Sequence, residues 1–109
     1  MKIIYHINNN KNWMEALINI KNMVEYYHEH QIEYEIDVVA DHDAIKEYQN
    51  PHLLIKDLFL KDVRFIACHQ SLKENHVEMK DIEDFICVVS LGVVEIALRQ
   101  SAGFQYIKV

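Results

Sequence analysis

The chain of 109 residues contains only two glycines and one proline. Two glycines cannot build a phosphate cradle, and neither the dinucleotide-binding fingerprint GxGxxG nor the P-loop motif occurs, so nothing indicates a nucleotide site. Half of the residues are hydrophobic, which excludes a disordered or low-complexity chain. This length and composition predict one globular domain over residues 1–109, built around a single core.

Positive charge is also scarce, because 11 Lys and Arg residues face 17 Asp and Glu residues and the formal net charge is -6. Nucleic acids and anionic membranes both attract a basic face, so direct binding to either is not expected. No hydrophobic run approaches the roughly 18 residues of a membrane-spanning helix. The segment Met1–Ile7 is too short for a signal peptide and indicates a first strand, so we expect a cytoplasmic protein.

The two cysteines, Cys68 and Cys87, are too few for a disulfide framework in a cytosolic chain. Cys68 is expected at the carboxyl end of one strand and Cys87 near the start of the next. If these strands are parallel neighbours, the thiols lie toward opposite edges of the sheet, too far apart to bridge. The seven histidines form no HExxH or other metal-ligand spacing, so we expect neither a metal site nor a cofactor.

Strand and helix patterns alternate along the whole chain. The expected strands are Lys2–Ile7, Glu33–Ala40, Val63–Ala67, Phe85–Val89 and Phe104–Val109. The expected helices run from Asn12 to about His30, then over Asp41–Tyr48, His52–Lys61, a turn after Cys68, Met79–Asp84 and Leu91–Ala102. Runs of apolar β-branched residues joined by helices predict a mainly parallel sheet covered on both faces, with the direction of the last strand left open.

Three polar residues are expected to cap helices. Asn12 and Ser71 each have a glutamate three positions later, which is the capping-box spacing. Ser90 is the expected N-cap of the helix Leu91–Ala102, and Gly103 is expected to end that helix.

Small and polar residues cluster where the first four strands end, and in a parallel sheet these ends share one edge. They are Asn8, Asn9, Asn10, Asp41, His42, Asp43, Cys68, His69, Gln70, Ser71, Ser90 and Gly92. Ligands bind at this edge of open α/β sheets, so one interpretation is a pocket around Cys68. The other is that turns and N-caps use the same residue types without any site.

Cys68 follows a buried strand and begins a helix, so its thiol would meet unpaired N–H groups and the positive end of a helix dipole. These favour the thiolate, which is the nucleophilic form. A lone cysteine is also often a small buried hydrophobe. His69 points in a different direction from its neighbour and has no orienting Asn or Asp partner, so a protease-like triad is not expected.

Several segments together resemble DsrE/DsrF-like proteins of the short single-domain branch. They are Lys2–Asn8, Ile36–Ala40, Val63–Leu72 and Val88–Ile107, and the likeness covers essentially the whole chain. The resemblance implies a three-layer α/β/α fold with a five-stranded, mainly parallel sheet of flavodoxin-like appearance, assembled as a homotrimer or hexamer. The large apolar share of so short a chain also favours a homo-oligomer.

Related proteins act in sulfur oxidation and in sulfur relay for tRNA thiolation, where a cysteine takes sulfane sulfur as a persulfide and passes it to a partner's cysteine. The position that matches this cysteine is Cys68. Ser71 and Leu72 match the turn behind it, and Ser90 and Gly92 match the neighbouring loop. The resemblance therefore implies donor and acceptor proteins as partners.

The first hypothesis is a sulfur carrier, in which the Cys68 thiolate attacks a persulfide and backbone N–H groups of Gln70 and Ser71 hold the charge. The candidate substrate-binding residues are Asn8, His69, Gln70, Ser71, Ser90 and Gly92. The second hypothesis is an oligomeric ligand- or partner-binding domain with an inert cysteine. A third, thiol redox sensing, needs a resolving cysteine from another chain.

Overall fold

Five parallel strands form the centre of the molecule, in a computed structural model that describes residues 1–109. The strands are β1 (Lys2–Ile7), β2 (Glu35–Ala40), β3 (Val63–Cys68), β4 (Cys87–Val89) and β5 (Gln105–Lys108). Their order across the sheet is β4-β3-β2-β1-β5. Every neighbouring pair is parallel, including β1 and β5, which settles the direction of the last strand.

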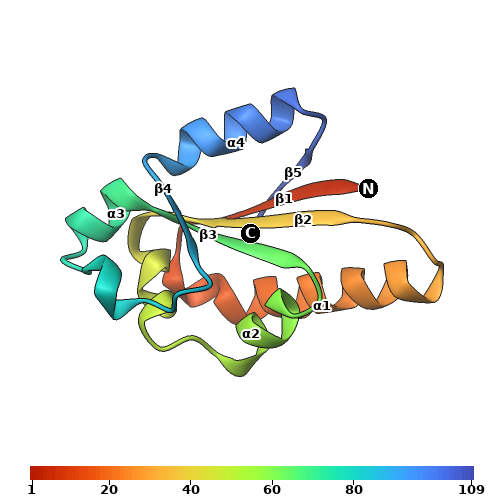
Figure 1. The fold of residues 1–109 in the computed structure, drawn as a ribbon, viewed down its shortest axis with the longest axis horizontal. Helices are drawn as coiled ribbons and strands as arrows, with labels where there is room; N and C mark the ends of the chain where they lie inside the picture. The colour runs from red at the N-terminus through yellow and green to blue at the C-terminus, as the bar shows by residue number, and fades with distance from the viewer.

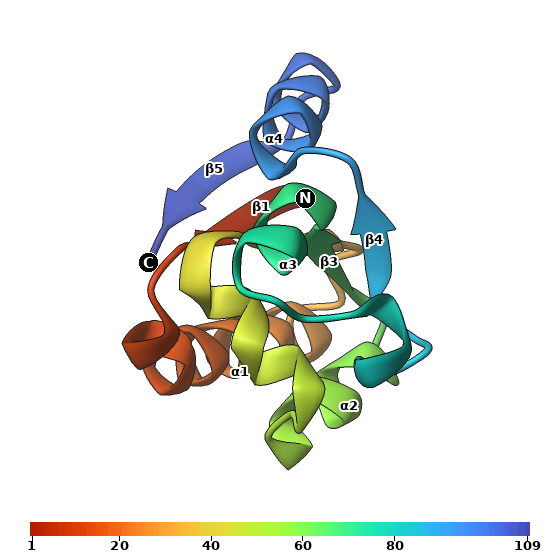
Figure 2. The ribbon, with the colours of Figure 1, turned by 90° about the vertical axis from the view of Figure 1, so that its left-hand side faces the viewer.

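Helices cover the two faces of the sheet unequally (Figure 1, Figure 2). One face carries α1 (Trp13–Glu29), the 3-10 helix η2 (His42–Gln49) and α2 (Leu53–Phe59). Only α4 (Gly92–Ser101) covers the other face, while α3 (His69–Glu74) follows the end of β3. Two short 3-10 turns complete the fold, η1 (Asn10–Asn12) and η3 (Met79–Asp81). The expected three-layer α/β/α architecture with a parallel sheet is confirmed.

The hydrophobic core is divided in the same unequal way. A cluster of 24 buried residues lies between the sheet and the helices α1 and α2, with Tyr5, Val38 and Phe65 pointing into it from the strands. The cluster under α4 has only five members, namely Ile4, Val39, Ile66, Ile96 and Phe104. The remaining strand positions on the α4 face are therefore free to carry polar side chains. None of the helices combines the length and hydropathy needed to cross a membrane.

The expected helix caps are wrong in three places. The chain is already helical over η1, so Asn12 lacks the extended conformation that a capping box needs and makes no capping hydrogen bond. Ser71 lies inside α3, because the extended residue before that helix is Cys68. Leu91, not Ser90, is the extended residue before α4. Gly103 follows α4 with a φ of +96°, as the expected helix stop requires.

The expected placement of the two cysteines toward opposite edges of the sheet is also wrong. Strand β4 has only three residues, fewer than the expected Phe85–Val89, and these pair with the last three residues of β3. Cys87 is therefore the register partner of Ile66, and Cys68 is that of Val89. Both thiols are free, and alternation along the strands puts them on the α4 face near the same edge.

Candidate functional site

The side chain of Cys68 is buried against the start of α4. Cys68 is the last residue of β3 and the residue before α3, and 5% of it is exposed. A Cβ atom on Gly92 would lie 3.4 Å from the Cys68 Cβ and 3.5 Å from Asp41 Oδ2. It would also lie 3.1 Å from Val39 Cγ1, so glycine lets the start of α4 approach the sheet this closely. Cys68 and Asp41 thus lie at one place beneath α4.

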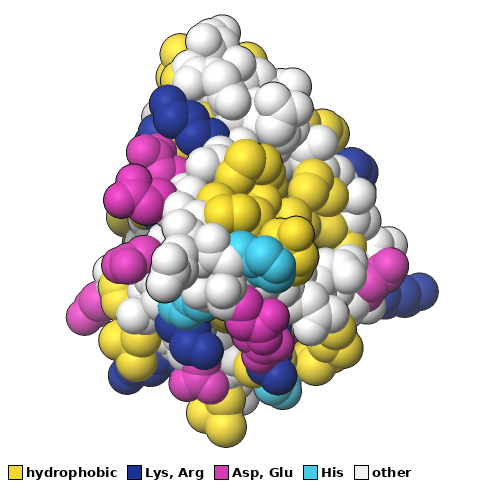
Figure 3. All heavy atoms as spheres, turned by 90° about the vertical axis from the view of Figure 1, so that its right-hand side faces the viewer, with side chains coloured by type: hydrophobic (Ala, Val, Ile, Leu, Met, Phe, Trp, Pro, Cys, Tyr) yellow, Lys and Arg dark blue, Asp and Glu magenta, His cyan; other side chains and the backbone are white.

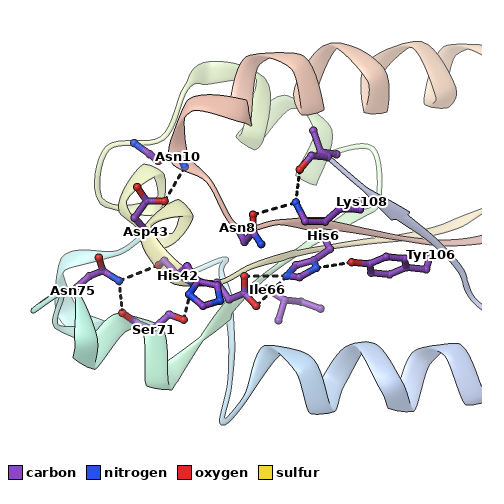
Figure 4. A network of polar contacts seen from close by, with 12 residues as sticks. His6, Asn8, Asn10, His42, Asp43, Ile66, Ser71, Asn75, Tyr106 and Lys108 are labelled. Carbon is purple, nitrogen blue, oxygen red and sulfur yellow. Dashed lines mark hydrogen bonds and ion pairs between the residues drawn. The ribbon is translucent and has the colours of Figure 1, made fainter.

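Asp41 belongs to a chain of three polar side chains on the same face of the sheet. His6 Nε2 lies 2.9 Å and 3.0 Å from the two carboxylate oxygens of Asp41. His6 Nδ1 lies 2.7 Å from the hydroxyl oxygen of Tyr106, so the imidazole bridges the other two side chains (Figure 4). The His6 and Asp41 side chains are 11% and 5% exposed, so water does little to weaken their contact.

The direction of these hydrogen bonds follows from the carboxylate. An ionised Asp41 can only accept, so Nε2 of His6 carries the hydrogen of that contact. Nδ1 accepts from the Tyr106 hydroxyl in a neutral ring and donates to it in an imidazolium. Burial and, after it, the charge of Asp41 raise the pKa of Tyr106, which therefore keeps its proton at neutral pH. The three side chains form a hydrogen-bonded chain that runs from β5 to the Asp41 carboxylate near the start of α4.

A second set of hydrogen bonds holds the turns around this place. His42 has a φ of +50°, and its backbone N–H donates to Ser71 Oγ at 2.8 Å. Asn75 Nδ2 donates to the carbonyl oxygens of His42 and Ser71. Asn8 Oδ1 accepts from Lys108 Nζ at 3.0 Å, which ties the end of β1 to β5 (Figure 4). The side chains of Ser71 and Asn8 therefore hold turns together in this structure.

The other expected site residues divide into two groups. The backbone N–H of Gln70, which was expected to hold the thiolate charge, donates to the Ser90 carbonyl at 3.3 Å in this structure. The contact instead joins the start of α3 to the turn before Gly92. His69 lines an open hollow of about 600 Å³ with Lys73 and residues of the segment 76–79, on the outside of α3.

A buried carboxyl group and two guanidinium groups lie farther along the same face. Asp37 Oδ2 is 3.2 Å from Arg99 Nε and 3.7 Å from Arg64 Nη1, and its side chain is 6% exposed. Glu95 contacts both arginines, at 3.7 Å and 3.2 Å. Burial raises the pKa of Asp37, although the charges of Arg64 and Arg99 act against the rise.

The burial of Asp37 should make the stability of the protein depend on pH. The pKa of Asp37 in the folded protein is raised above its ordinary 3.8. The stabilisation linked to this raised pKa is therefore fully present below pH 3.8 and is lost as the pH rises through the folded pKa. The free energy of unfolding of the native chain, relative to Asp37→Asn, should therefore fall as the pH rises from below 3.8 through the raised folded pKa. Urea titrations at several pH values measure it, with the exposed Asp57→Asn as control. A flat difference for Asp37→Asn would contradict the assignment.

The amino-terminal end of the sheet carries a separate open hollow of about 510 Å³. Met1, His28, Ile32 and Tyr34 contribute to its wall, and Figure 3 shows hydrophobic side chains gathered beside a histidine on this end of the molecule. The hollow also includes the first residues of β1 and β2, whereas Cys68 lies at the opposite ends of the strands. It is therefore not part of the cysteine site. No group of three or more His, Cys, Asp or Glu side chains is placed to hold a metal ion.

These features define a parallel α/β protein with a buried cysteine at the carboxyl edge of its sheet. No protein-family model matches the chain, and neither does any curated protein. Among solved structures, the protein of unknown function MTH1491 from Methanobacterium thermoautotrophicum is 24% identical, with a TM-score of 0.87 over 99% of this chain and 98% of that one. The ychN protein from E. coli is 12% identical, with a TM-score of 0.74 over 100% of both chains. At these identities the likeness shows the fold.

Sequence reasoning missed His6 and Tyr106. It grouped Asp41 with the polar turn residues but gave it no partner. One signal was present: His6 is a polar residue inside the otherwise apolar run Ile3–Ile7, and a buried polar side chain needs a hydrogen-bond partner. The partners lie 35 and 100 residues away in sequence, so only the fold identifies them.

Proposed function

We propose that this protein is a sulfur carrier, in which Cys68 holds sulfane sulfur as a persulfide and passes it to a cysteine of a partner protein. The observation that carries the proposal is the position of Cys68 at the end of β3, between the starts of α3 and α4. Chemistry gathers at this edge of open parallel sheets. The resemblance to DsrE/DsrF-like proteins, in which a cysteine carries sulfur, supports the same function.

The loading step needs no oxidant. The Cys68 thiolate attacks the outer sulfur of a donor persulfide, a new S–S bond forms, and the donor's cysteine leaves as a thiolate. Asp41 lies near Cys68 at the start of α4, and its contact with His6 holds the carboxylate in place.

A donor can reach Cys68 only if its cover moves, because just 5% of the residue is exposed. The start of α4 at Gly92 lies against Cys68, and the turn before it is joined to α3 by a 3.3 Å hydrogen bond from Gln70 N–H to the Ser90 carbonyl. Movement of this turn away from β3 would expose the thiol.

Intact mass after exposure to a persulfide donor tests the proposal. The native chain and Cys87→Ser should each gain sulfur in steps of about 32 Da, reversed by reductant, whereas Cys68→Ser should lose nearly all uptake. The substitution removes one buried sulfur and should leave the thermal unfolding transition almost unchanged. A Cys68→Ser protein that loads as much sulfur as the native chain would sink the proposal.

A second candidate function is a homo-oligomeric domain, a trimer or hexamer, that binds a partner or small ligand without using its cysteine. The observation that favours it is a group of exposed apolar side chains on α4 and immediately before it, namely Leu91, Val94 and Leu98. An oligomeric protein can also carry sulfur. The mass experiment therefore tests whether Cys68 carries sulfur and does not test self-association.

A further inference from the structure

The second cysteine lies one strand away from Cys68 and on the same face of the sheet. Cys87 pairs in register with Ile66, which is two residues before Cys68 and faces α4. From a strand spacing of about 4.8 Å and a rise of about 3.3 Å per residue, the two cysteine Cα atoms are about 8 Å apart. They form a diagonal pair across the end of the sheet.

Arg64 holds the thiol of Cys87. Its Nη2 atom lies 3.5 Å from Cys87 Sγ, and a guanidinium beside a thiol favours the thiolate. Burial acts to lower the pKa of Arg64, but the hydrogen bond to Cys87 and the charges of Asp37, Cys87 and Glu95 raise it, and the net direction is upward. Arg64 is therefore fixed as a cation, with Asp37 and Glu95 on its other sides.

The two thiols differ in access. Cys68 is buried, whereas Cys87 is half-buried on β4, the edge strand of the sheet. A sulfur atom held on Cys68 would be shielded from solvent, and one held on Cys87 would be within reach of another molecule.

We propose that Cys87 is a second sulfur-carrying thiol, which takes the outer sulfur from a Cys68 persulfide and presents it at the edge of the sheet. The inference rests on the proposed function of Cys68. In the step, the Cys87 thiolate attacks the outer sulfur, the S–S bond on Cys68 breaks, and Cys68 leaves as a thiolate. One S–S bond forms as another breaks, so the exchange needs neither oxidant nor reductant.

Distance favours this transfer over a disulfide between the two cysteines. Disulfides usually join Cα atoms about 4.4–6.8 Å apart, and this pair lies beyond that range. A persulfide extends the reach of Cys68 by one S–S bond of about 2 Å, which spans the remaining gap. The same spacing thus disfavours a disulfide and permits movement of the outer sulfur.

Site-resolved labelling tests the relay. The native chain is loaded briefly with inorganic polysulfide, freed of it by gel filtration, alkylated at successive times and mapped by peptide mass. The extra sulfur should appear first on Cys68 and then on Cys87. In Cys68→Ser, loading of Cys87 should fall about tenfold. Arg64→Gln should slow arrival at Cys87 about tenfold without changing the loading of Cys68.

Arg99→Gln is the matched control, because Arg99 shares Asp37 and Glu95 with Arg64 but does not contact Cys87. Its transfer rate should stay within about twofold of the native rate.

Sulfur confined to Cys68 throughout, or equal loading of Cys87 in Cys68→Ser, overturns the relay and leaves the proposed function standing. Sulfur absent from Cys68 in the native chain overturns both. Circular dichroism confirms that each variant is folded, and Cys87→Ala repeats the Cys87→Ser measurement.

Discussion

Replacing Asp41 with alanine is expected to lower the free energy of unfolding by about 3 kcal/mol. The substitution leaves the buried Nε2 atom of His6 without its two acceptor contacts, at 2.9 Å and 3.0 Å. The imidazole cannot turn to water, because its side chain is 11% exposed and Nδ1 is held by Tyr106. A buried polar atom that loses its partner costs the free energy of its desolvation. Urea unfolding at neutral pH measures the loss.

Two variants make the measurement specific. Asp57→Ala removes an exposed carboxylate from α2 and should change the free energy of unfolding by less than about 0.5 kcal/mol. Tyr106→Phe keeps the ring but removes the hydroxyl, and should cost about 1 kcal/mol. Because His6 links Asp41 and Tyr106, the double variant should lose less than the sum of the two single losses. Equal effects of Asp41→Ala and Asp57→Ala would show that the His6 contact contributes nothing.

The order and type of the elements could be predicted because each strand is a short apolar run and each long helix repeats its apolar residues at helical spacing. The segment from Trp13 through Ile20 to Tyr27 is buried on one side of α1, as that spacing requires. Parallel pairing followed from the helices between strands, which return the chain to the same edge of the sheet. These signals are local or topological, so a single sequence is enough to detect them.

The site could be predicted only in outline. The carboxyl edge and Cys68 follow from the strand-to-helix order, but the roles of Ser71 and Ser90 do not. A serine that caps a helix and a serine that accepts from a distant backbone N–H look alike in sequence. Ser71 does the second, through His42 N–H, and Ser90 uses its carbonyl oxygen. The placement of Cys87 also failed, because register depends on how many residues of β4 find partners on β3.

The α4 face of the sheet carries the cysteine site, and its incomplete helical cover makes it the expected subunit interface as well. On that face α4 is the only helix, and it leaves Arg64 and Tyr106 partly exposed on either side of it. The opposite face buries nearly five times as many core residues. A neighbouring subunit would complete this face and would lie close to both thiols, so self-association would also control access to the sulfur.

Replacing Leu98 with glutamate is therefore expected to weaken self-association about 30-fold, which corresponds to about 2 kcal/mol. Leu98 is 61% exposed in the isolated chain and lies one turn after Val94 on the same side of α4. A carboxylate at the centre of an apolar interface would have to be desolvated without a partner. Sedimentation velocity over a range of concentrations measures the change, with the native chain expected to sediment as an oligomer.

Leu53→Glu is the matched control, because Leu53 is the same residue type and at 79% is even more exposed, but it lies on α2 on the opposite face of the sheet. The same charge placed there should leave the oligomer intact. If Leu53→Glu dissociated it as strongly as Leu98→Glu, the effect would come from net charge and not from the α4 face. If the native chain sedimented as a monomer, Leu91, Val94 and Leu98 would have no partner copy, and cover for Cys87 would have to come from another protein.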